Sequence, residues 1–233
     1  GVYDLGRGGF SQLELTDSHG GEALDRGAPV AGEIRIADRS YANAQSWQRF
    51  LQAGEGRADY IIRMRWNTVR LVDAANERFD IIAWLRTLPQ ASDTHETTMW
   101  AQSGKHQKPL RIRLIARRKA PEAIEATLKH LRRQASRKQS RIDERSLVAA
   151  EYLIVATSLP QAEFPPCEVL AAYRLRWQIE LAFKKLKSLM KIDEIRTRTA
   201  VGTRCWLYAH MIVALLCQDL SQDVLDSFPS GTG

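Results

Sequence analysis

The chain has 233 residues, with 34 lysines and arginines against 27 aspartates and glutamates, and a net charge of +7. This length suits one sizeable domain or one domain with an insertion, and the positive charge fits a polyanionic partner such as nucleic acid. The three cysteines, Cys167, Cys205 and Cys217, are odd in number and lack metal-ligand spacing, which argues against a disulfide framework and for a reduced cytosolic setting.

The first third of the chain predicts a strand–helix–strand unit. The opening "GVYDLGRGGF" lacks an initiator Met and lies inside a predicted strand and turn, so we expect a fragment whose upstream part is missing. Residues 10–16 alternate apolar and polar, as a half-buried strand does. "GEIRIAD" (32–38) and "DYIIRMRW" (59–66) predict two further strands. The segment 40–54 between them has apolar residues at helical spacing and ends in a glycine. This order is a βαβ pattern.

Residues 64–150 differ from the preceding segment in their predicted elements and in their charge, which indicates an insertion. "HETTMWAQ" and "PLRIRLIARRKA" predict paired strands, and residues 121–142 predict a helix with Pro121 in its first turn. Residues 111–145 contain twelve lysines and arginines and four acidic residues, a surplus of eight that exceeds the net charge of the whole chain. Such a segment is either a solvated helix face or a surface that contacts phosphates.

The last third returns to a strand and then to helices. "AEYLIVATSL" (150–159) predicts a strand, and the segment 165–193 that follows contains a predicted helix over residues 172–190. The segment 203–220 is apolar nearly all round and should pack as a covering helix. Its longest apolar run, "MIVALLC", is far shorter than the roughly 18 residues that a membrane span needs. No signal peptide is visible.

One face of the long predicted helix carries a mixed polar set. At about 100° per residue, Tyr173, Arg176, Glu180 and Lys187 fall within an arc of roughly 60°. The apolar residues form a separate stripe that should face the core. Arg176 and Glu180 also have the i,i+4 spacing of an ordinary surface salt bridge, so this ridge has either a structural or a chemical role.

A second carboxylate stands where a strand ends. Asp38 follows the Ile-rich strand and precedes a helix, and α/β sheets place ligands at the carboxyl ends of their strands. The alternative is an N-terminal helix cap. Asp38 and Glu180 together offer oxygen ligands for hard divalent cations. Two such cations can stabilise the attacking and leaving oxygens of a phosphoryl displacement.

These residues resemble a known family. "YRLRWQIELAFKKLK" matches Y-(2)-R-(3)-E-(6)-K, the signature of DDE transposases of the insertion-sequence-four family, with Tyr173, Arg176, Glu180 and Lys187 in the four places. "IADRSY" resembles the family's strand with the second catalytic Asp, and "LTDSHGGEAL" resembles the segment before it. The resemblance covers essentially the whole chain.

The resemblance implies an α/β, ribonuclease-H-like mixed sheet flanked by helices and interrupted by a mostly β insertion with one basic helix. The corresponding parts are residues 1–63, 64–150 and 151–233. It implies Asp38 and Glu180 as catalytic ligands of two Mg²⁺ or Mn²⁺ ions, and Tyr173, Arg176 and Lys187 as DNA-backbone contacts. The implied partners are the inverted-repeat ends of the element and target DNA, bound by a homodimer in the bacterial cytosol near the nucleoid.

The family's first catalytic Asp has no match in this chain. Asp4 is the early candidate by position, but only one full strand and a polar link separate it from Asp38, where the fold requires two further antiparallel strands. Asp17 and Asp25 fall in that link. We therefore expect the first Asp, and the family's N-terminal DNA-binding region, upstream of Gly1, and we expect residues 1–233 to be unable to catalyse strand transfer alone.

Several alternatives stay open at this point. In relatives a tryptophan of the insertion stacks on a flipped base, and Trp66, Trp84 and Trp100 lie in that region, but a core role fits each of them as well. His19 has either an active-site or a turn role. The competing functions are a ribonuclease-H-like nuclease that uses Asp38 and Glu180, and a non-catalytic DNA-binding remnant held to DNA by residues 111–145.

Overall fold

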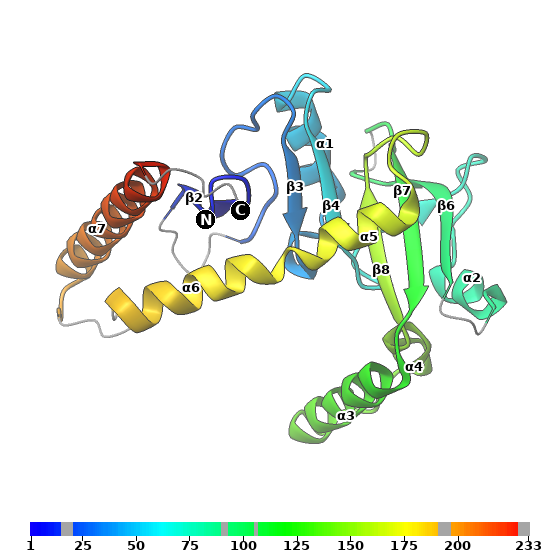
Figure 1. The fold of residues 1–233 in the computed structure, drawn as a ribbon. Coiled ribbons are helices and arrows are strands. Elements are labelled where there is room, and N and C mark those ends of the chain that lie inside the picture. The colour runs from blue at the N-terminus through cyan, green and yellow to red at the C-terminus, as the bar shows by residue number, and fades with distance from the viewer. Residues whose placement is uncertain (15–20, 90–92, 105–106, 191–196, 228–233) are drawn as a thin grey trace, which may run out of the picture. The chain divides into compact units, whose positions relative to one another are not determined.

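A computed structural model describes residues 1–14, 21–89, 93–104, 107–190 and 197–227. The chain forms two compact units (Figure 1). One unit combines Gly1–Gly21 with Leu175–Gly233, and the other is the continuous segment Glu22–Arg174.

The unit Glu22–Arg174 is built on a six-stranded mixed sheet with the order β3-β4-β8-β7-β6-β5. The strands are β3 (Ile34–Ala37), β4 (Asp59–Arg63), β5 (Leu71–Val72), β6 (Thr94–Ala101), β7 (Leu110–Arg118) and β8 (Tyr152–Thr157). β3 and β4 are parallel, and every other neighbouring pair is antiparallel. The mixed α/β class is thereby confirmed, and strands from residues 64–150 belong to the same sheet as β3, β4 and β8.

Helices cover both faces of this sheet. The helices of this unit are η1 (Arg39–Tyr41), α1 (Ala44–Ala53), α2 (Ile81–Thr87), α3 (Pro121–Arg137), α4 (Glu144–Ala150) and α5 (Pro166–Arg174), of which α3 extends away from the sheet (Figure 1). Alternate residues of a strand point to opposite faces, so Ile62 packs with α1 and α2 while its neighbour Ile61 packs with α5. The two faces therefore have separate hydrophobic cores.

The predicted βαβ unit is confirmed by β3, α1 and β4. Asn43 caps α1, and its side chain accepts hydrogen bonds from the backbone N–H groups of Gln45 and Ser46. Trp47 and Phe50 are fully buried against the sheet, as their spacing predicts. Gly54 ends the helix. The crossover leaves β3 and β4 parallel, with their carboxyl ends at one edge of the sheet.

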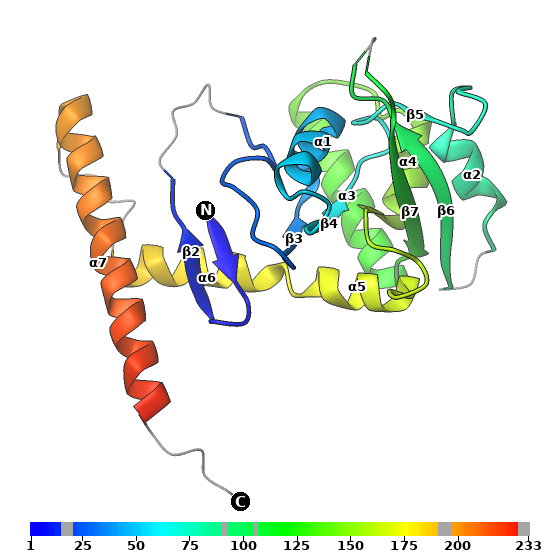
Figure 2. The same cartoon turned by 90° about the horizontal axis from the view of Figure 1, so that it is seen from above.

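The other unit contains a hairpin and two helices (Figure 2). β1 (Val2–Asp4) and β2 (Gly9–Gln12) are antiparallel, and the helices are α6 (Trp177–Met190) and α7 (Ala200–Ser227). The ring of Phe10 lies 5.1 Å from that of Phe183, centroid to centroid, and joins β2 to α6. The strand predicted over residues 10–16 is present, but it ends at Gln12.

The prediction of one continuous helix over residues 172–190 is wrong. α5 ends at Arg174 and α6 begins at Trp177, with a turn at Leu175 and Arg176. Neither turn residue is Gly or Pro, so no local signal marks the break. The prediction that Tyr173, Arg176, Glu180 and Lys187 share one helix face requires a continuous helix. Of these four residues, only Glu180 and Lys187 lie within α6.

The covering role predicted for the last helix is also wrong within the described chain. Its apolar side chains are largely exposed, among them Val201, Ile212 and Leu220. By length and composition alone, Ala200–Cys217 is apolar enough to cross a bilayer, with a mean hydropathy of 1.4. The sequence had excluded such a stretch because the longest uninterrupted apolar run is short. A single helix of this kind is weak evidence for a membrane span.

Candidate functional site

Asp38 lies directly after β3, at the carboxyl edge of the sheet. Its Oδ1 accepts a hydrogen bond of 2.8 Å from the backbone N–H of Ser40, so the residue caps η1. Within the described chain Oδ2 has no hydrogen-bond partner. The capping role is therefore confirmed, and it leaves one carboxylate oxygen for another ligand.

The strand register places Asp38 beside a cation. Ala37 pairs with Ile62, so the next positions along these parallel strands, Asp38 and Arg63, are neighbours. Both follow residues that face the α1 side, so both belong to the α5 face of the sheet. Burial, Glu22 and Asp38 together raise the pKa of the nearby Tyr41 phenol, which keeps it neutral beside the carboxylate.

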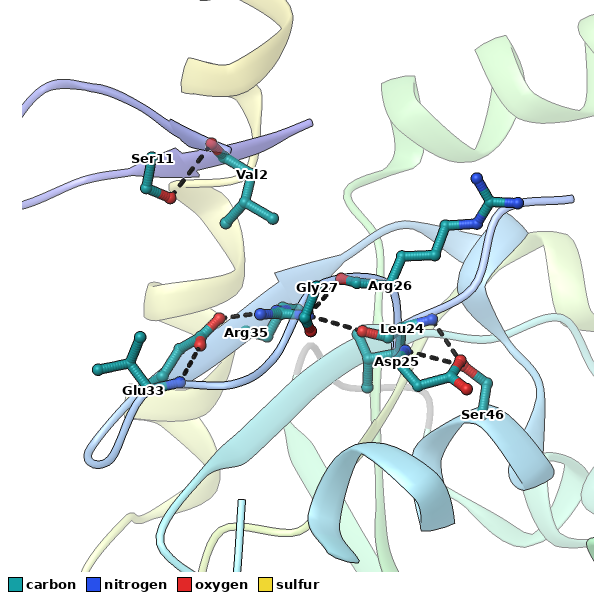
Figure 3. Close-up of polar contacts among 10 residues, drawn as sticks. Val2, Ser11, Leu24, Asp25, Arg26, Gly27, Glu33, Arg35 and Ser46 are labelled. Atoms are coloured by element: carbon teal, nitrogen blue, oxygen red, sulfur yellow. Dashed lines mark hydrogen bonds and ion pairs between the residues drawn. The ribbon is translucent and has the colours of Figure 1, made fainter. Parts of the chain in front are cut away.

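Hydrogen bonds of the buried Arg35 connect residues 24–26, which precede β3, to that strand (Figure 3). The Arg35 guanidinium donates from Nη1 to the carbonyl oxygens of Leu24 (2.7 Å) and Arg26 (3.1 Å), and from Nε to Glu33 Oε1 (2.7 Å). Ser46 Oγ accepts hydrogen bonds from the backbone of Leu24 (2.6 Å) and Asp25 (3.2 Å). These bonds hold the base of the strand that carries Asp38.

The early aspartates considered for the first catalytic position have structural partners. Asp25 Oδ1 accepts a hydrogen bond of 2.7 Å from Ser46 Oγ, and its Oδ2 lies 3.7 Å from Arg49. Asp4 Oδ1 accepts hydrogen bonds from the backbone of Gly6 and Arg7 in the β1–β2 turn. Asp17 and His19 lie outside the described residues.

Cations gather at the same edge as Asp38. β3, β4 and β7 run in one direction, so Arg39, Arg63 and Lys119 all stand at or after carboxyl ends of strands. Burial, followed by the charges of Arg63 and Arg39, lowers the pKa of the Lys119 ammonium to about 8. We call these three residues the cationic edge. The sequence analysis did not predict the cationic edge, although the position of Arg63 at the end of an Ile-rich strand indicated a cation at this edge.

The depressed pKa of Lys119 predicts a specific pH dependence. Between pH 8 and 10.5 the unfolded chain keeps the Lys119 proton and the folded chain releases it, so this group makes the folded state more stable as the pH rises. Lys119→Met removes that contribution. Thermal unfolding of both proteins should therefore show the melting temperature of the variant falling relative to the parent across this window. A constant difference would contradict the assignment.

Glu180 and Lys187 lie on α6, seven residues apart and therefore on one face of that helix. Arg176 Nη1 donates to Glu180 Oε1 at 2.6 Å, so the predicted i,i+4 salt bridge is present. Glu180 remains 63% exposed, and a pair of this kind contributes only about 0.2–0.5 kcal/mol. The carboxylate of Glu180 is thus accessible to another cation.

Tyr173 is not part of α6. It belongs to α5, where its side chain is 7% exposed and packs in the core with Ile61, Val155 and Leu170. Its apolar ring therefore anchors α5 to the sheet. The prediction that Tyr173 shares a helix ridge with Arg176, Glu180 and Lys187 is wrong because the helix ends between them.

The two proposed metal ligands belong to different units, Asp38 to Glu22–Arg174 and Glu180 to the other. Within the described ranges no three His, Cys, Asp or Glu side chains gather into a metal site. The donor chemistry nevertheless fits, since Mg²⁺ in proteins is bound through one or two carboxylates and retains several waters.

Two of the three insertion tryptophans have packing partners. Trp66 packs against the core and lies under the Arg145 guanidinium, 4.5 Å from ring centroid to Cζ, and its Nε1 donates to Ser146 Oγ. Trp84 packs against the same core beside Phe79. The core interpretation is supported for both. Trp100 is half-buried on β6.

The basic segment 111–145 divides into two kinds of cation. Arg113, Arg118 and Arg145 form ion pairs with Glu96 (2.7 Å), Glu151 (2.8 Å) and Asp143 (2.8 Å). In contrast, α3 carries exposed cations for which no acidic partner is present in the part of the chain that the structure describes. Those residues are Lys129, Arg132, Arg133 and Arg137, with Lys138 at the C-cap.

Comparison with known proteins gives one consistent result. The family model of the transposase DDE domain matches residues 15–216. The putative transposase InsL of insertion sequence element IS186A from Escherichia coli K12 is 39% identical over 233 residues, which is 99% of this chain and 62% of the relative. The transposase of IS421 from Escherichia coli has the same identity and coverage.

More distant relatives agree with these two. The transposase of IS231F from Bacillus thuringiensis subsp. israelensis is 29% identical over 92% of this chain and 48% of its own length. The chain thus spans less than two thirds of the curated relatives that it matches. No solved structure matches the chain significantly.

Proposed function

The chain belongs to the transposase DDE domain family, and from this premise we propose that the protein is a DNA transposase of the insertion-sequence-four type. It would cleave phosphodiesters at the ends of an insertion sequence and join the freed 3′-hydroxyl to target DNA. The observation that carries this proposal is a family match over residues 15–216, with Asp38 standing at the carboxyl edge of the matched sheet.

Asp38 and Glu180 are the proposed metal ligands. When bound, two Mg²⁺ or Mn²⁺ ions would polarise the attacking and leaving oxygens of the phosphodiester. Asp38 Oδ2 and the exposed carboxylate of Glu180 would bind metal, while Oδ1 of Asp38 keeps its bond to Ser40 and fixes the carboxylate. Arg176 and Lys187 would bind DNA phosphates near Glu180. Arg176 would donate two parallel hydrogen bonds to one phosphate, and Lys187 would attract a phosphate as a point charge.

Tyr173 has a more restricted proposed role. Because both its ring and its phenol oxygen are buried, the residue would chiefly position the polypeptide that leads to Arg176. Substituting Tyr173 by Phe tests the phenol alone, since the ring and its packing are retained.

The catalytic domain would comprise residues 1–63 and 151–233, interrupted by residues 64–150. The first catalytic Asp would come from sequence preceding residue 1, so residues 1–233 alone would form an incomplete catalyst. The transposase would act as a homodimer on paired DNA ends in the bacterial cytoplasm.

Nicking of DNA in the presence of Mg²⁺ tests this proposal. The chain by itself should not nick a labelled duplex carrying the element's end, whereas the chain extended by its upstream coding sequence should, and EDTA should stop the reaction. Full activity from residues 1–233 would refute the incomplete site. Inactivity of the extended protein on its own ends would contradict the transposase assignment.

The second candidate is a DNA-binding remnant without catalytic activity, and the exposed cations of α3 favour it. It predicts DNA binding that persists in EDTA and no cleavage by the extended protein in Mg²⁺. The steep salt dependence expected of phosphate contacts would be common to both candidates.

A further inference from the structure

The exposed cations of α3 lie together on one side of the helix. At about 100° per residue, Lys129, Arg132, Arg133 and Arg137 fall within an arc of roughly 140°. The opposite side carries the half-buried Ile124, Leu128 and Leu131, which face the rest of the protein. We call the four cations the α3 face.

Ordinary helix stabilisation does not account for this face. The helix dipole favours cations near the C-terminus, but this effect falls off within the last turn, whereas Lys129, Arg132 and Arg133 stand in the middle of α3. Acidic residues occur only in its first part, at Glu122 and Glu125, and no described acidic side chain forms an ion pair with the α3 face. The mutual repulsion of four like charges at this spacing destabilises a helix unless an anion binds to them.

Hydrogen bonds of Lys119 hold α3 next to the edge of the sheet that carries Asp38. Lys119 Nζ donates to the carbonyl oxygen of Ala150 at the end of α4 (2.6 Å) and to Thr127 Oγ1 on α3 (3.4 Å). α3 therefore leaves the sheet at the edge where β3 and β7 both end (Figure 1). The same edge bears Arg39 and Arg63, which act on the pKa of Lys119. Positive charge thus continues from α3 to the surroundings of Asp38.

We propose that the α3 face and the cationic edge form one binding surface for the sugar–phosphate backbone of duplex DNA, with α3 holding the duplex beside Asp38. The inference rests on the proposed function, because DNA is the substrate. DNA carries one charge per about 1.7 Å of helix axis, so a duplex offers several phosphates to a face of this length. The contacts are with the backbone, so they strengthen binding to every sequence alike.

The paired arginines of the same segment are excluded from this surface. Arg113 is buried on β7, where its Nη1 and Nη2 groups donate to Glu96 and to the carbonyl oxygens of Leu159 and Phe164. Arg118 is bonded to Glu151. The structure thus assigns DNA binding to part of the basic segment and stabilisation of the fold to the rest.

The experiment measures the salt dependence of DNA binding in EDTA, where no cleavage intervenes. The variant Lys129→Gln/Arg132→Gln/Arg133→Gln/Arg137→Gln keeps residues that favour a helix and removes four charges. Fluorescence anisotropy with a labelled duplex, between about 50 and 200 mM salt, should show the slope of log K against log[salt] falling by about three to four units relative to the parent chain.

A matched control removes four cations from the opposite edge of the sheet. Arg57, Arg70, Lys108 and Arg111 are exposed and precede or begin β4, β5 and β7 at their amino ends. Substituting all four by Gln makes the same change in net charge, but should alter the slope by less than about one unit. Thermal unfolding of both variants establishes that each is folded.

Equal slopes for the two variants would overturn the inference, as would a parent chain that does not bind duplex DNA. An unchanged slope for the α3 variant would mean that the α3 face binds another anionic surface and not DNA, such as the surface of a second copy of the chain. If the fourfold variant is unfolded, the pairs Lys129→Gln/Arg133→Gln and Arg132→Gln/Arg137→Gln should each remove about half of the effect. Failure of nicking with a normal slope would count against the proposed function and not against this surface.

Discussion

Replacing Asp38 with asparagine is expected to lower Mg²⁺-dependent DNA nicking by about 10³-fold in the complete transposase, since metal ions supply several kcal/mol of charge stabilisation to this reaction. Asparagine caps a helix about as well as aspartate, so the hydrogen bond from the Ser40 N–H is retained. The neutral amide, however, is a poorer ligand for a hard divalent cation than the carboxylate. The substitution therefore separates the capping role of Asp38 from its proposed metal-binding role.

Asp80→Asn is the matched control for this experiment. Asp80 caps α2 through hydrogen bonds from the backbone N–H groups of Ile82 and Ala83, as Asp38 caps η1, and it has no proposed metal. Both variants should unfold at nearly the parent temperature, and only Asp38→Asn should lose nicking. Weaker binding of Mn²⁺ to the Asp38→Asn chain gives a readout that does not depend on catalysis. Undiminished nicking by this variant would show that Asp38 is only a cap.

Replacing Arg113 with methionine is expected to cost about 3 kcal/mol of folding free energy, the lower end of the range for breaking a buried ion pair. The Arg113 and Glu96 side chains are 9% and 18% exposed, so removing the cation leaves a largely buried carboxylate without its cationic partner. The carbonyl oxygens of Leu159 and Phe164 lose donors as well. Chemical denaturation of parent and variant measures the difference.

Arg133→Met provides the contrast within the same basic segment. This side chain is exposed on α3, so its replacement should change the free energy of unfolding by less than about 0.5 kcal/mol. The double variant Arg113→Met/Glu96→Met should be more stable than Arg113→Met alone, because it removes the buried charge that the single change leaves unpaired. If Arg113→Met and Arg133→Met were equally mild, the division of the segment into structural and binding cations would be incorrect.

The elements that the sequence predicted well are those with a local pattern. β3, α1 and β4 followed from Ile-rich runs flanking helical spacing, and α3 followed from a helical segment with Pro121 in its first turn. The break between α5 and α6 was not predictable in this way, because Leu175 and Arg176 carry no helix-ending signal. The buried Tyr173 belongs to α5 and packs on strands distant in the sequence, a contact that helical periodicity does not encode.

The sequence by itself determined the membership of the family, the βαβ unit whose first strand is followed by Asp38, and the concentration of positive charge in residues 111–145. These properties depend on residue identity and on spacing over a few positions. The tertiary structure decided which of those charges remain available. Arg113 is neutralised by Glu96 across the β6–β7 hairpin, and Lys119 joins α3 and α4 to the edge that bears Asp38. Such pairings arise only when strands and helices from separate parts of the chain are brought together, so spacing alone does not reveal them.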